Sequence, residues 1–170
     1  MTIPGISTLY SILKRDIDRD NDIFNQRKKL SDELVENCRK WAEILIDTFD
    51  HAVERWEVEG REAAEREIMK QEMDFMKLDY WSIEETSPIL LFLKKDTRFA
   101  EFSHSCAEFY KSALYVKRLV YGQIESHPGV YVSSQDVGIR KMVELWKNEI
   151  ERMLRDVTTE HMRVKVLLPK

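Results

Sequence analysis

Residues 30–56, LSDELVENCRKWAEILIDTFDHAVERW, carry the pattern that decides the fold. Their apolar residues recur in steps of three and four, at positions 30, 34, 38, 41, 45, 49, 52 and 56, and further apolar residues at 35, 42, 46 and 53 widen the stripe. This period with so broad a face is typical of an amphipathic helix that buries one side in a core. The stretch therefore predicts a long helix packed against other helices.

The same period continues on both sides of this stretch. Residues 3–18 predict a first amphipathic helix, and Ser87 before Pro88 predicts the start of a short one. Asp96 or Thr97 can cap the next helix, whose stripe runs from Phe99 to residue 124. A final helix is predicted from about residue 134, with its stripe at positions 139, 142, 143, 146, 150, 153, 154 and 157.

Together these segments predict an all-α fold, an antiparallel helical bundle of four to five helices with at least one long helix, in a single domain over residues 1–170. The chain has only five Gly and four Pro in 170 residues, which favours long helices. The clearest loop is predicted at residues 125–136, where Pro128 and Gly129 adjoin and Ser133 with Asp136 forms a capping box.

Two places leave the helix boundaries open. Beyond Trp56 the segment becomes highly charged, and either Gly60 breaks the helix or the charged segment continues and projects. At the other end, Met162, Val164, Val166 and Leu168 alternate at period two. This alternation predicts a short extended C-terminal tail that could dock on a partner.

The cysteines, the apolar runs and the charge distribution indicate the cellular compartment and the kind of partner. Cys38 and Cys106 are isolated and each falls within an apolar stripe, so we expect both to be free packing residues in a reducing compartment. The longest apolar run is too short to span a membrane, and we expect a cytoplasmic protein. Residues 1–85 carry 13 basic and 21 acidic side chains, whereas residues 86–170 carry 14 basic and 10 acidic ones. This asymmetry predicts that the two halves attract each other, or that the basic half faces a polyanion.

Alternating aspartates raise the possibility of a calcium loop. Asp16, Asp18, Asp20 and Asp22 follow the spacing of early EF-hand ligands. The sixth loop position, however, holds Asn21 instead of Gly, and the twelfth holds a cation, Arg27, instead of Glu. We therefore expect residues 20–22 to end one helix and cap the next, and we expect no metal site there.

A second possible metal motif is Glu101-x-x-His104, the spacing that di-iron bundles use. Asp47, Asp50 and His51 could supply ligands from another helix. No second E-x-x-H occurs, and His104 lies off the phenylalanine stripe. We expect His104 at a boundary or facing solvent, and no metal or other cofactor.

Two segments pair an Arg with a His six residues later: Arg98 with His104, and Arg155 with His161, where Asp156 follows the Arg. This spacing resembles that of HEPN-type helical ribonucleases. The resemblance implies a metal-independent RNase in which a dimer pairs the His residues as general acid and base, while Arg stabilises the phosphate charge. A second alternative is nucleic-acid binding without catalysis, through basic residues interleaved with tyrosines: Lys94, Lys95, Arg98, Lys111, Lys117 and Arg118.

The function we favour from the sequence is a non-enzymatic helical interaction module, such as an adaptor, assembly subunit or regulator. The amphipathic first helix, the charged segment after Trp56 and the apolar tail can each engage a neighbour. A protein partner or self-association is therefore expected, with nucleic acid as the other possible partner.

Overall fold

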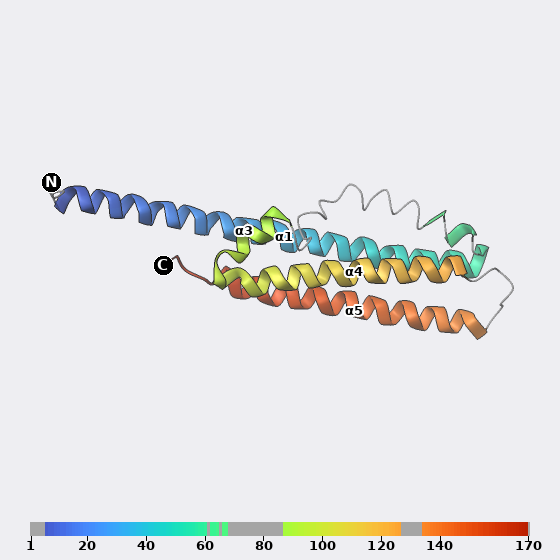
Figure 1. Cartoon of the computed structure of the whole chain (residues 1–170). Helices are drawn as coiled ribbons and strands as arrows, with labels where there is room; N and C mark the ends of the chain where they lie inside the picture. The colour runs from blue at the N-terminus through green and yellow to red at the C-terminus, as the bar shows by residue number, and fades with distance from the viewer. Residues whose placement is uncertain (1–5, 61, 65, 68–86, 127–133, 170) are drawn as a thin grey trace.

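A computed structural model describes residues 6–60, 62–64, 66–67, 87–126 and 134–169. The long elements are α1 (Ile6–Glu59), α4 (Ala100–Ser126) and α5 (Ser134–Lys165), and the short helix α3 (Pro88–Lys94) and the 3-10 turn η2 (Thr97–Phe99) come between α1 and α4 in the chain. No strand occurs among these residues. The all-α bundle with a long helix is confirmed, and Figure 1 shows its elongated form.

Helix α1 is longer than the sequence predicted. It runs for 54 residues, roughly 81 Å at 1.5 Å per residue. The predicted break at Asp20–Asp22 is wrong, since these residues lie inside the helix. Asp and Asn cost a helix interior only about 0.7 kcal/mol each, and no Gly or Pro interrupts the backbone between Ile6 and Glu59.

The question left open at Gly60 has a clear answer. Helix α1 ends at Glu59, and Gly60 follows it with φ +87, donating its backbone N–H to the carbonyl of Trp56 at 3.0 Å. A glycine in this left-handed conformation is a common helix terminator, because other residues pay a steric penalty there. Apolar residues return in the sequence at positions 69, 73, 75, 76, 78, 80 and 81, which lie outside the described residues.

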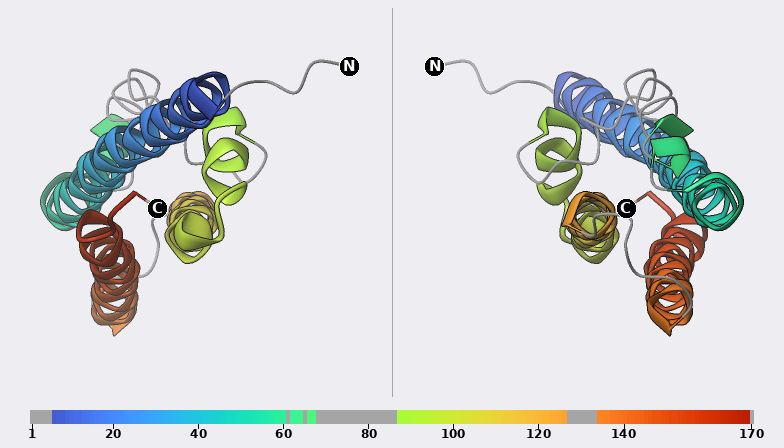
Figure 2. Two further views of the ribbon diagram at one scale, coloured as in Figure 1. Left: turned by 90° about the vertical axis from the view of Figure 1, so that its left-hand side faces the viewer. Right: turned by 90° about the vertical axis from the view of Figure 1, so that its right-hand side faces the viewer.

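The three long helices pack around one core. In Figure 2 they occupy the corners of a triangle, and α3 lies between α1 and α4. Helix α4 runs parallel to α1, because Phe24 meets Phe99 near one end and Trp41 meets Phe109 further along, with ring centroids 5.8 and 5.9 Å apart. Helix α5 runs antiparallel to both (Figure 1).

The core contains the residues of the predicted stripes. Leu34, Leu45, Phe102, Phe109 and Ile150 are each at most 1% exposed. Burial of such side chains is the main stabilising term, worth about 1.5–3 kcal/mol for each. At the bundle's rim, Lys147 of α5 donates to Asp50 of α1 at 2.6 and 2.7 Å, so one ion pair links the basic half of the chain to the acidic half.

The helix starts predicted at Ser87 and at Asp96 are confirmed. The Ser87 side chain accepts a hydrogen bond from the N–H of Leu90 at 3.1 Å, with Pro88 in the first turn of α3. Asp96 caps η2 by accepting from the N–H of Arg98 at 3.1 Å. Helix α5 starts at Ser134 as predicted, whereas Ser133 of the predicted capping box lies outside the described residues.

The extended tail is shorter than predicted. Helix α5 continues to Lys165, so Met162 and Val164 are helical and only residues 166–169 lie beyond the helix, beginning with a turn at Val166. Val157, His161 and Val164 are buried at helical spacing against the core, which outweighs the period-two pattern. Lys28 of α1 then donates to the carbonyls of Lys165 and Leu167 at 2.6 and 3.2 Å, and so caps the end of α5.

Candidate functional site

The N-terminal part of α1 extends beyond α4 and α5 (Figure 1). We call residues 6–20 the projecting segment. Every side chain from Lys14 to Asp20 is exposed, and Ile17 is 54% exposed. Phe24, two turns further on, is 2% exposed and packs on Phe99. The projecting segment therefore begins where the bundle's cover of α1 stops.

The apolar face of α1 continues into the projecting segment. Ile17 and Phe24 are seven residues apart, which places them on one face after two turns. The backbone is helical from Ile6, so positions 6, 10 and 13, which are apolar in the sequence, share that register. Beyond Phe24 this face is covered by the bundle, whereas at Ile17 it is open.

A cavity of about 480 Å³ lies where the projecting segment meets the bundle. Its α1 wall includes Ile17, Ile23 and Phe24, and its other walls come from residues 95–98, at the end of α3 and in η2, and from Pro169 of the tail. The charged lining residues are Asp20, Arg27, Lys95, Asp96 and Arg98. The cavity thus combines an apolar wall with a rim of both charges.

Asp96 organises the charges of this cavity. Its carboxylate accepts from the Arg98 guanidinium at 2.9 and 2.7 Å, and Arg27 of α1 lies 3.7 Å away. The hydrogen bond from Arg98 holds the pKa of Asp96 below its ordinary value, with Arg27 adding to this effect and burial opposing it. The guanidinium carbons of Arg98 and Arg27 also lie over the rings of Phe24 and Phe92, at 4.5 and 4.7 Å from the centroids. Both cations are therefore engaged within the chain.

The tail is held at the same end of the bundle. Arg98 donates to the carbonyl of Leu168 at 3.0 Å, and Pro169 lines the cavity beside Ile17. Val166 and Leu168 nevertheless remain 77% and 79% exposed. The backbone of the tail is therefore held to the bundle, while its apolar side chains face solvent.

The structure separates Arg155 from His161. The two lie six residues apart on α5, about 120° around the helix axis. Arg155 and Asp156 are exposed, with Asp156 accepting from Arg152 at 3.0 Å. His161 is 8% exposed, and its Nε2 lies 2.7 Å from Asp32. Within the chain these residues do not converge on one site.

The other predicted pair is also divided. Arg98 is committed to Asp96 and Leu168, whereas His104 is exposed on α4 as expected. The pairing of these His residues across a dimer stays a prediction.

The predicted nucleic-acid residues are spread along the bundle. Lys94 and Lys95 lie at the end of α3, while Lys111 pairs with Glu108 at 3.1 Å in α4. Lys117 and Arg118 lie on α4, with side chains outside the described residues. Tyr110 stacks on Trp41 at 5.4 Å and so contributes to packing. The described residues form no continuous basic face with an open stacking ring.

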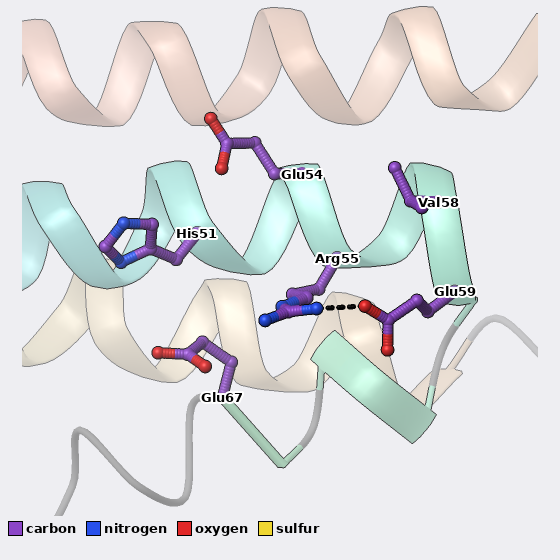
Figure 3. A pocket seen from close by; sticks show the side chains of 6 residues that line it. All are labelled: His51, Glu54, Arg55, Val58, Glu59 and Glu67. Carbon is purple, nitrogen blue, oxygen red and sulfur yellow. Dashed lines mark hydrogen bonds and ion pairs between the residues drawn. The ribbon is translucent and has the colours of Figure 1, made fainter.

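A further cavity, of about 340 Å³, lies beside the C-terminal end of α1 (Figure 3). His51, Arg55, Glu59 and Glu67 line it, and Arg55 pairs with Glu59. Across the described ranges, no three His, Cys, Asp or Glu side chains are grouped so that they could hold a metal ion. Glu101 and His104 of the possible di-iron motif are both exposed on α4, and the described residues place no further carboxylates beside them of the kind that a di-iron site needs.

Sequence reasoning missed the charge cluster around Asp96. The D-x-R spacing of Asp96 and Arg98 is a local capping signal, but nothing local points to Arg27, which lies far away in the sequence.

No protein family, curated protein or solved structure matches the chain in the comparisons. Among the described helices, none is long and apolar enough to cross a lipid bilayer.

Proposed function

We propose that this protein is a non-enzymatic helical interaction module that self-associates through the projecting segment of α1. The observation that carries the proposal is the contrast between Ile17 and Phe24. These residues share one face of α1, yet Ile17 is 54% exposed and Phe24 is 2% exposed. Exposed apolar faces that continue a buried core face are typical of association surfaces.

A second copy of the chain is the partner that this geometry favours. In a dimer with two-fold symmetry the apolar stripe of each copy would pack against the same stripe of the other copy, so a single interface would bury both stripes. The stripe is long enough for helix-on-helix packing, since residues 6–20 span about 22 Å at 1.5 Å per residue. Ile17 also lines the cavity at the base of the projecting segment, and this cavity could accommodate the end of the partner's helix.

The tail supports the same surface. Val166 and Leu168 expose apolar side chains at the end of the bundle from which α1 projects. Their backbone is held by Lys28 and Arg98, so these side chains are presented from an ordered support. A partner bound along α1 could gain contacts with them as well.

The experiment is light-scattering mass on a sizing column at low and high salt, with the absorbance ratio recorded for co-purifying nucleic acid. We expect a salt-resistant dimer or larger oligomer, because burial of apolar surface is little weakened by salt. The variant Ile17→Glu should shift the mass towards the monomer. Arg15→Gln, on the opposite face, is the matched control, since it alters the net charge equally and should leave the oligomer intact.

Other outcomes would contradict the proposal. A wild-type monomer at all concentrations would overturn it, as would equal effects of Ile17→Glu and Arg15→Gln. A salt-sensitive species carrying nucleic acid would instead support the basic half as the functional surface. In that case replacing Lys117 and Arg118 should weaken binding and reduce its salt dependence.

A further inference from the structure

Two cysteines far apart in the sequence, Cys38 on α1 and Cys106 on α4, are both buried in the core. Cys38 precedes Trp41 by one turn, and Cys106 precedes Phe109 by one turn. The Trp41 and Phe109 rings lie 5.9 Å apart. Because α1 and α4 run parallel, the residues one turn earlier on each helix also face each other. The Cys38 thiol is close enough to raise the pKa of the Cys106 thiol.

The surroundings of this pair keep it reduced while the bundle is closed. Both cysteines are 0% exposed. Burial raises the pKa of the Cys106 thiol, and the neighbouring Cys38 raises it further. Since the thiolate is the reactive form, oxidation in the closed core should be slow. It should speed up when local opening parts α1 from α4.

We propose that Cys38 and Cys106 are a latent redox pair, which a peroxide converts into an intramolecular disulfide that ties α1 to α4. One sulfur attacks the peroxide O–O bond, forming a sulfenic acid and releasing water. The second sulfur then displaces the hydroxyl group as a second water, and the S–S bond forms. The two thiols lose two electrons and two protons, which reduce the peroxide to two molecules of water.

The fold favours this product over other oxidised forms. A disulfide needs its sulfurs about 2.05 Å apart, and the two buried thiols lie in the same layer of the core, one turn before the contact between Trp41 and Phe109. The second thiol can therefore capture the sulfenic acid before further oxidation. The inference is independent of self-association, because both sulfurs belong to one copy of the chain.

The test treats the reduced full-length chain with hydrogen peroxide, in buffer and in urea below the unfolding transition. We expect a mass lower by about 2 Da, for two lost hydrogens, and a peptide map that links Cys38 to Cys106. The reaction should be faster in the mild urea, because α1 and α4 part more often. In fully denaturing urea the yield of linked peptide should fall, since the fold no longer holds the sulfurs together.

Single-cysteine variants provide the control. Cys38→Ala and Cys106→Ala each leave one thiol, so neither should lose this mass, and each should instead gain oxygen or link two copies. Should a variant fail to fold, the peptide map of the wild type decides alone. Wild-type chains that gain oxygen without the internal link, link only between copies, or stay reduced in mild urea would overturn the proposal.

Discussion

His161 on α5 and Asp32 on α1 join two helices at the end of the bundle, with Nε2 of His161 2.7 Å from Oδ1 of Asp32. The residue His161 is 8% exposed, whereas the Asp32 side chain is 54% exposed. The His161 ring also contacts Phe102, with the centroids 5.9 Å apart. In this setting His161 is a packing residue that links all three long helices.

Replacing His161 should therefore lower the stability of the fold. We expect His161→Ala to reduce the free energy of unfolding by about 1–3 kcal/mol, because it removes a hydrogen bond and a buried ring. Urea unfolding followed by circular dichroism measures the change. Asp32→Ala should cost less, because its carboxylate is half exposed. A larger loss for Asp32→Ala than for His161→Ala would contradict this account.

Cleavage of RNA is tested most cleanly at His104. Its side chain is exposed, so His104→Ala should leave the free energy of unfolding within about 0.5 kcal/mol of the wild-type value. As an interaction module, the wild type should not cleave fluorescently labelled RNAs, alone or after oligomer formation. Cleavage that disappears in His104→Ala, with an unchanged circular dichroism spectrum, would support the ribonuclease alternative instead.

The Asp96 cluster should make stability depend on pH in the acid range. Its pKa is lowered in the folded state from the ordinary value of 3.8, so the unfolded chain takes up the proton first as pH falls. The stabilisation is present in full above about pH 4 and is lost as pH falls through the folded-state pKa. Asp96→Asn should remove part of this slope in urea unfolding measured from pH 6 to pH 3.

A matched change sharpens that test. Asp156 pairs with Arg152 on the exposed face of α5, where a carboxylate contributes little. Asp156→Asn should thus leave the acid slope nearly unchanged. Equal slopes for wild type and Asp96→Asn would rule out Asp96 as its source.

Gly60 should resist substitution although it has room for a side chain. A Cβ added there would meet nothing within 4 Å, but φ is +87. We expect Gly60→Ala to lower the free energy of unfolding by about 1–2 kcal/mol, the cost of a left-handed alanine. Gly60→Asn should cost less, because asparagine tolerates this conformation better. Thermal or urea unfolding of both variants checks the order, and an alanine as stable as glycine would contradict it.

Local signals in the sequence account for most of the helices. The stripes at 30–56 and 99–124, the cap at Ser87 and the glycine at 60 each act within a few residues, so they can be read without knowing the fold. The same signals placed Cys38, Cys106 and Phe109 in the core correctly. They also placed His104 at the surface.

Local sequence patterns predicted the structure incorrectly at two places. The cap-forming residues Asp20–Asp22 sit inside α1, because the helix backbone tolerates them at small cost. The alternating tail becomes helical as far as Lys165, because Val164 is buried in the core and Lys28 of α1 caps the last carbonyls. Neither contact can be foreseen from the residues nearby.

The sequence by itself determined that this chain forms amphipathic helices, where their main stripes lie and which residues face inward. Only the tertiary structure decided that Arg27 joins Asp96, that Asp32 meets His161, that Cys38 and Cys106 share one core and that Ile17 stays exposed. The physical reason is the separation along the sequence between the residues that interact. Helix periodicity and capping arise from neighbours within four residues, whereas these contacts depend on how whole helices align, which is set by the packing of the entire core.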